Sequence, residues 1–162
     1  MKKRIPSLPE TIAVDASIVV KWFKKGETHE QQALKVREDI FTTKLHAIAP
    51  EWLFLELVRA LVKIGYPKNK IEEAYESLKE AASLDLIEVV PMSGFLDKAK
   101  EVEIELKLFA SDATYFATAI ACHTDLLTED KHLLNKRVST YAEKEGIRIL
   151  ALETIETDLS LR

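Results

Sequence analysis

Four acidic residues stand at positions where a surface carboxylate is unusual. Asp15 directly follows a short β-prone run, Asp130 comes soon after another, and Asp112 begins a stretch almost free of charge. Glu56 is the only acid in the apolar segment 52–64. A carboxylate in apolar surroundings is costly unless it is paired or binds a metal. Oxygen ligands favour Mg²⁺ or Mn²⁺, and the histidines show no zinc-binding spacing, so we interpret the four acids as one divalent-metal site.

Each acid also has a purely structural interpretation. Asp15 could cap the helix that follows it, and Asp112 could complement the positive end of its own helix, with Ser111 as the cap. Asp130 could be a solvated turn residue, and Glu56 could lie on an exposed helical stripe. The four acids together favour a shared site, because carboxylates that converge repel each other and a cation removes that repulsion.

The elements that must position these acids alternate between strands and helices. We expect strands at 11–14, 46–49, 86–90, 125–128 and 147–150. Helices are expected at 16–23, 28–41, 51–64, 70–84, 95–108 and 112–123, with a helical turn at 131–136 and a helix ending at 141–145. This order predicts a single three-layer α/β/α domain over residues 1–162, core about 11–152, with a mostly parallel sheet of about five strands. In such sheets ligands bind at the carboxyl ends of the strands.

Composition and charge exclude several classes of protein. No apolar run reaches the roughly 20 residues of a membrane span, and no apolar stretch follows the basic start, so we expect neither membrane insertion nor a signal peptide. The only cysteine, Cys122, excludes an intrachain disulfide and favours a cytoplasmic protein. The net charge of −4 argues against non-specific duplex binding, but not against a nuclease whose acids hold metal.

At the four acids the sequence resembles the PIN-domain nucleases, in particular the VapC-like toxin ribonucleases of VapBC toxin–antitoxin systems. The resemblance is carried by VDASIVVKW (14–22), APEWLFLEL (49–57), DATYFATA (112–119) and LLTED (126–130). Ser111 stands where some relatives have a further acid. A second metal ion would therefore depend on Glu129 and Asp112.

The resemblance implies a metal-dependent endoribonuclease that hydrolyses RNA phosphodiester bonds as the toxin of a toxin–antitoxin pair. We expect Asp15, Glu56, Asp112 and Asp130 to be catalytic and to hold Mg²⁺ or Mn²⁺, with Asp15 and Asp112 as direct ligands. RNA and a cognate antitoxin are the implied partners, and apolar helices suggest a homodimer. The alternative is a catalytically inactive PIN-fold module that binds RNA or protein; a phosphate-accepting signalling receiver fits less well, because it needs an early pair of acids.

Two hydroxyl residues are candidates for supporting the metal ligands. Ser17 could assist Asp15 or cap a helix, and Thr128 could orient Asp130 or only end a strand.

Five further residues are candidate RNA contacts. Lys21, Arg59 and Lys63 lie on elements next to the predicted site and could meet phosphates, although we favour solvated side chains. Trp22 and Trp52 could stack on unpaired bases, although core packing is the favoured interpretation for both.

Overall fold

The structure is a computed structural model that describes residues 8–156. Its strands are β1 (Thr11–Val14), β2 (His46–Pro50), β3 (Ile87–Val90), β4 (Asp125–Leu127) and β5 (Ile149–Leu150). Its α-helices are α1 (Ala16–Val19), α2 (Glu30–Phe41), α3 (Leu53–Lys63), α4 (Lys68–Ser83), α5 (Leu96–Leu106), α6 (Ala110–Ala121) and α7 (Lys136–Lys144). Short 3₁₀ turns are η1 (Val20–Trp22), η2 (Met92–Gly94) and η3 (Leu152–Thr154). The basic start, where we expect no signal peptide, lies outside the described residues, as do residues 157–162.

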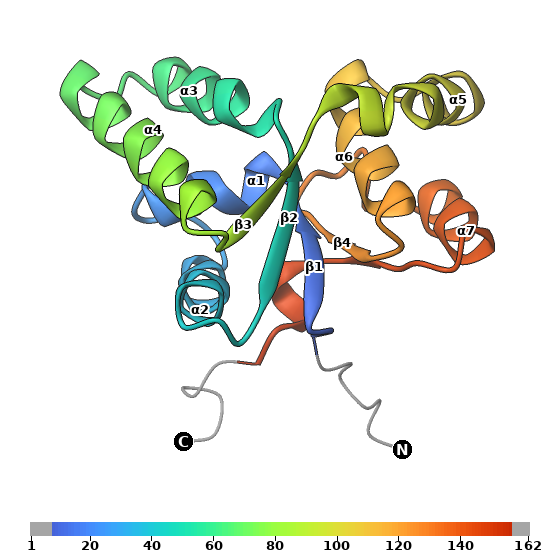
Figure 1. Ribbon diagram of the computed structural model, residues 1–162, viewed down its shortest axis with the longest axis horizontal. Coiled ribbons are helices and arrows are strands. Elements are labelled where there is room, and N and C mark those ends of the chain that lie inside the picture. Colours follow the sequence, from blue (N-terminus) through green and yellow to red (C-terminus); the bar gives the residue numbers. More distant parts are fainter. Residues whose placement is uncertain (1–7, 157–162) are drawn as a thin grey trace.

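The five strands form one sheet in the order β3-β2-β1-β4-β5, and all four pairings are parallel. Figure 1 shows α1–α4 on one side of this sheet and α5–α7 on the other. The prediction of a three-layer α/β/α fold with about five strands is therefore confirmed. No helix in the described part of the chain is both long and apolar enough to cross a membrane.

The strand order reverses between β1 and β4. The chain runs from β1 outward through β2 to β3, then returns to place β4 on the other side of β1 and β5 beyond it. In open parallel sheets such a switch point leaves a crevice outside the carboxyl ends of the two strands. Val14 and Leu127 are paired at these ends, so the residues that follow them enter the crevice side by side.

The core between the layers is built around α6. This helix contacts β1, β2 and β4, and eight of its residues are buried, including Tyr115 and Phe116. An all-round apolar helix is expected where a helix is covered on every side. The same burial explains the nearly uncharged sequence from Ala113 to Ile120.

Three predicted helix boundaries were wrong. α6 begins at Ala110, with Phe109 as its N-cap, because the left-handed backbone of Lys107 (φ 55°) ends α5 and turns the chain. Asp112 therefore lies in the first turn rather than opening the helix, and Ser111 is not the cap. Residues 131–135 form turns, since Asn135 caps α7 by accepting a hydrogen bond from the Val138 amide.

The third boundary lies after β1. The predicted helix 16–23 divides into α1 and the tighter turn η1.

Candidate active site

Asp15 is held at the switch point by two hydroxyl groups. Thr128 Oγ1 donates to Asp15 Oδ2 at 2.5 Å, and Ser17 Oγ donates to the same oxygen at 3.2 Å. Each hydroxyl also accepts a backbone amide from the loop after β4: Glu129 N reaches Ser17 Oγ at 2.9 Å and Asp130 N reaches Thr128 Oγ1 at 3.0 Å. The loops after β1 and β4 are thereby joined around one buried carboxylate, and the Asp15 side chain also caps α1.

Thr128→Val is expected to lower the free energy of unfolding by about 1–3 kcal/mol. Thr128 is fully buried, so the variant removes the shorter of the two hydroxyl hydrogen bonds to the Asp15 carboxylate and leaves the Asp130 amide without its partner. Urea unfolding in chelator measures the change. Thr42→Val is the matched control, because the Thr42 hydroxyl is exposed, and it should change stability by no more than about 0.5 kcal/mol. Equal urea midpoints for Thr128→Val and Thr42→Val would show that the Thr128 hydroxyl does not stabilise the folded chain.

The four predicted acids line one hollow of about 530 Å³. Asp112 enters it from the first turn of α6 and is buried, whereas Glu56 enters from the first turn of α3 and is half-buried, like Asp130. Asp15 forms the remaining wall. The acids therefore come from four separate segments of the chain, brought together by the sheet and by the two helices that follow β2 and α5.

Burial and mutual repulsion raise the pKa values of Asp15, Glu56 and Asp112. Desolvation, with smaller contributions from the charges of Asp130, Asp15 and Glu56, raises the pKa of Asp112 to about 7. Desolvation also raises the pKa of Asp15 to about 6, although the hydroxyl of Thr128 and the amide of Ser17 oppose the change. The pKa of Glu56 is raised chiefly by desolvation as well. The surroundings of these three acids thus disfavour the ionised form of each carboxylate. A bound cation would stabilise that form.

The family to which the chain belongs follows from its sequence match. Residues 12–138 match the family model described as "PIN domain". The chain belongs to the PIN-domain family. Members of this family are generally nucleases, and the match contains all four acids. No curated protein sequence matches the chain.

Three solved structures share the fold of this PIN domain. A structure described as "FitAB bound to IR36 DNA fragment" superposes with a TM-score of 0.63 at 11% identity, covering 91% of this chain and 99% of that one. The structure of FitAcB from Neisseria gonorrhoeae superposes with a TM-score of 0.56 at 12% identity, covering 89% of this chain and 99% of that one. A chain of a toxin–antitoxin complex from Klebsiella pneumoniae superposes with a TM-score of 0.53 at 16% identity, covering 76% of this chain and 91% of that one. At these identities the likeness is one of fold.

One group beside the acids of the PIN-domain site was missed in the sequence analysis, the hydroxyl of Tyr115. This hydroxyl is buried, and a hydrogen bond with the Glu56 carboxylate contributes to the pKa of both groups. Burial, followed by the charges of Glu56 and Asp15, raises its pKa well above the usual value. Its position three residues after Asp112 places it on the same face of α6, a spacing that was available from the sequence.

A divalent cation fits the donor chemistry of the hollow. The donors are carboxylate oxygens, and the raised pKa values of Asp15 and Asp112 indicate negative charges that no neighbouring cation compensates. Within residues 8–156, however, no group of three or more His, Cys, Asp or Glu side chains is arranged to hold one ion jointly. A site with two direct carboxylate ligands and water-mediated contacts to the others agrees with both observations.

Glu129 lines the hollow but is already engaged. One of its carboxylate oxygens accepts the Leu152 amide at 2.8 Å, and the other lies 2.9 Å from His29 Nδ1. Both contacts connect the loop after β4 to neighbouring segments. We therefore leave Glu129 out of the proposed metal ligands, which removes one of the two acids on which a second ion would depend.

The predicted RNA-contacting cations differ in availability. Arg59 and Lys63 are exposed on α3 and line the hollow. Lys21 also lines it, but the interpretation of Lys21 as a solvated residue was wrong, since its side chain is only 9% exposed. Its Nζ donates to Thr28 O at 2.6 Å and lies 3.8 Å from Glu27 Oε2, so it supports the loop before α2.

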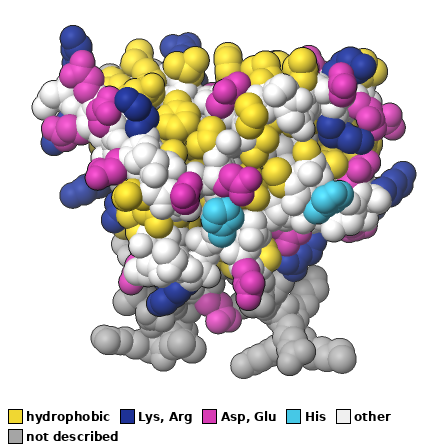
Figure 2. Space-filling model, in the orientation of Figure 1, with side chains coloured by type: hydrophobic (Ala, Val, Ile, Leu, Met, Phe, Trp, Pro, Cys, Tyr) yellow, Lys and Arg dark blue, Asp and Glu magenta, His cyan; other side chains and the backbone are white. Residues whose placement is uncertain are grey.

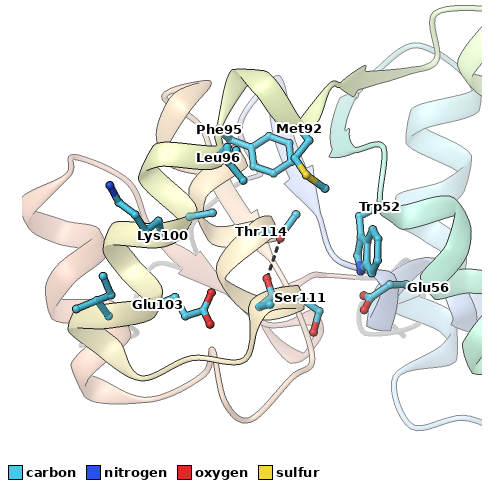
Figure 3. A pocket seen from close by; sticks show the side chains of 12 residues that line it. Trp52, Glu56, Met92, Phe95, Leu96, Lys100, Glu103, Ser111 and Thr114 are labelled. Carbon is cyan, nitrogen blue, oxygen red and sulfur yellow. Dashed lines mark hydrogen bonds between the residues drawn. The ribbon is translucent and has the colours of Figure 1, made fainter.

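The prediction of core packing is confirmed for Trp22 but was wrong for Trp52. Trp22 is buried, whereas Trp52 is 39% exposed. Trp52 lines a separate apolar pocket of about 890 Å³, which shares Glu56 and Ser111 with the carboxylate hollow. Figure 3 shows the Trp52 ring beside Glu56, with Phe95 on another wall of the pocket.

Proposed function

We propose that this PIN domain is a metal-dependent endoribonuclease that acts as the toxin of a toxin–antitoxin pair. The observation that supports it most is the meeting of four carboxylates in one hollow at the switch point of the sheet, with the pKa values of three of them raised. A structural role for each acid does not account for this arrangement, because it places like charges together in a partly dry site.

Asp15 and Asp112 are the proposed direct ligands of Mg²⁺ or Mn²⁺, and Glu56 and Asp130 the proposed water-mediated ones. Such an ion would supply polarisation of the phosphate and a more acidic water. In the hydrolysis the water oxygen forms a new bond to phosphorus, the bond to the leaving ribose oxygen breaks, and that oxygen takes up a proton.

The remaining residues of the hollow have positioning roles in this proposal. Thr128 and Ser17 fix the orientation of Asp15 through the hydrogen bonds described above. Arg59 and Lys63 are exposed at the rim, where their cations can meet RNA phosphates. Because Lys21 is held by backbone and Glu27, we assign it no substrate contact.

A protein partner is proposed from the exposed apolar surface. Hydrophobic side chains gather along the upper edge of the face shown in Figure 2, and Leu55, Leu96 and Ile104 are each more than half exposed. Together with the fold shared with toxin–antitoxin proteins, this surface supports a homodimer and a cognate antitoxin. Light scattering during size exclusion would give about twice the 18.4 kDa chain mass for a dimer, and the chain mass would refute it.

Cleavage of RNA in the presence of metal is the direct test. The purified chain is expected to cut a mixed pool of single-stranded RNA with Mg²⁺ or Mn²⁺, to lose that activity in chelator, and to leave a matched pool of single-stranded DNA less affected. Cutting of DNA alone would refute the proposed substrate. No cutting of any pool with either ion, by a chain shown to be folded, would instead favour the inactive RNA- or protein-binding module.

A further inference from the structure

We propose that a basic pocket beside the carboxylate hollow binds the phosphate backbone of single-stranded RNA next to the cut bond. The pocket has a volume of about 170 Å³ and lies between the α5–α6 loop and the start of α7. Its cations are Lys107, Lys131 and Arg137, and Phe109 and His132 also line it. The inference rests on the proposed function for its substrate, but concerns residues outside the four acids.

The charge of this basic pocket is unusual for the chain. No acidic residue is among the side chains that line it, although the protein as a whole carries a net charge of −4. Over residues 8–156, none of Lys107, Lys131 and Arg137 takes part in an ion pair. Three permanent cations without acidic partners around a small pocket fit an anion of phosphate size.

The basic pocket is continuous with the proposed catalytic residues along the chain. Lys131 directly follows Asp130, and the His132 amide donates to Asp130 Oδ1 at 2.7 Å. On the other side, Phe109 is the N-cap of α6, the helix whose first turn carries Asp112. A strand of RNA that reaches the carboxylates can therefore continue toward this pocket.

The rim of the basic pocket adds an aromatic surface. Phe109 is 67% exposed, and its ring meets His132 edge-to-face with centroids 5.4 Å apart. A neighbouring hollow of about 420 Å³ along α7 shares Arg137 and adds Lys136 and Lys144. Cations that follow the backbone, combined with an exposed ring for a base, are the features by which proteins bind single-stranded nucleic acid.

Cations beyond those at the rim of the carboxylate hollow, Arg59 and Lys63, would favour the approach of RNA to the acids of the proposed active site. Four carboxylates repel an approaching polyanion, and Lys21, which lies among them, is held by other groups. The aromatic rim favours RNA over an acidic protein segment, which would need the cations alone.

The test measures binding separately from cutting. The full chain carrying Asp112→Asn, in chelator, is titrated into labelled single-stranded RNA and followed by fluorescence anisotropy between about 50 and 200 mM salt. Lys107→Gln, Lys131→Gln and Arg137→Gln are then added together. The expected result is an affinity loss of tenfold or more, and a fall of about 2 in the slope of log affinity against log salt, since each lost phosphate contact in single strands contributes about 0.7.

A matched control has the same change in net charge on another helix. Lys68→Gln, Lys70→Gln and Lys79→Gln remove three exposed cations of α4, none of which lines either hollow. This control should bind RNA within about twofold of the parent. An equal loss in both triple variants would overturn the inference, because net charge alone would then explain binding.

Two further measurements distinguish a loss of RNA contacts from a loss of folding. Arg137 donates to Glu105 O at 3.2 Å, so the double variant of Lys107 and Lys131 is measured as well, and Lys107→Arg with Lys131→Arg should restore affinity. If the pocket variants bind RNA normally but lose binding to polyglutamate, the inference is overturned in favour of an acidic protein partner. Loss of RNA binding without any cutting by the unmodified chain would support this inference while refuting the proposed function.

Discussion

Replacing Asp112 with asparagine is expected to lower the rate of RNA cleavage by on the order of a thousandfold while leaving the fold intact. Asp112 is buried in the first turn of α6 and is one of the two proposed direct ligands. Asparagine keeps the shape of the side chain but removes the charge that holds a divalent ion. Single-turnover cleavage of labelled RNA at saturating Mn²⁺ measures the effect.

The matched control for Asp112→Asn is an acid near the site but outside the hollow. Glu103 is exposed on α5 and lines only the apolar pocket beside Trp52. Glu103→Gln makes the same change of charge and should leave the rate within about twofold. If Asp112→Asn cuts RNA at the rate of this control, Asp112 is not a metal ligand, and the carboxylate site must be reassigned.

The same Asp112→Asn substitution is expected to stabilise the metal-free protein at pH 8. The pKa of Asp112 is raised from its ordinary value of 3.8 to about 7 in the folded chain, chiefly by desolvation. The folded state therefore holds a proton that the unfolded state releases, so stability is lost as the pH rises from about 4 to about 7. Asparagine does not ionise, so the variant avoids this loss in the free energy of unfolding. We expect a difference of about 1–2 kcal/mol, because water in the open hollow screens part of the electrostatic effect.

Thermal unfolding in chelator across pH tests this second effect. The melting temperature of Asp112→Asn should exceed that of the parent by a few degrees at pH 8 and match it near pH 4. In the parent, added Mg²⁺ or Mn²⁺ should raise the melting temperature more at pH 8 than at pH 5, since the ion binds the ionised carboxylates. A parent that is more stable than the variant at pH 8 without metal would contradict the raised pKa.

The acids at the strand ends were predictable because the positions of strands depend on short-range sequence. Asp15 and Asp130 follow apolar runs that form β1 and β4, and parallel strands present their carboxyl ends at one edge. Glu56 and Asp112 were recognisable as acids in apolar helices. All four line one hollow.

The exposure of individual side chains was less predictable, because it depends on where helices begin and turn. Trp52 was assigned to the core, but its backbone is already helical, and its position places it on the side of Glu56 rather than on the buried stripe of Leu53 and Leu57. Lys21 lies in η1, whose tighter winding departs from the spacing of an α-helix. A boundary error of one or two residues therefore reverses the burial assigned to a side chain.

The basic pocket could not be predicted from the sequence at all. Lys107 is the C-cap of α5, Lys131 belongs to the loop after β4, and Arg137 lies in the first turn of α7. Each is a surface cation in its own segment. Only the packing of α5, α6 and α7 on one side of the sheet brings the three together, and local patterns contain no information about that packing.

The hydrogen bond from Thr128 to Asp15 joins residues 113 positions apart, across the pairing of β1 with β4. During synthesis β1 and β2 leave the ribosome long before β4 exists, so the carboxylate hollow has no fourth wall until most of the chain has been made. Closing so long a loop is also a slow folding event. A nascent or truncated chain lacking β4 therefore has no complete carboxylate site.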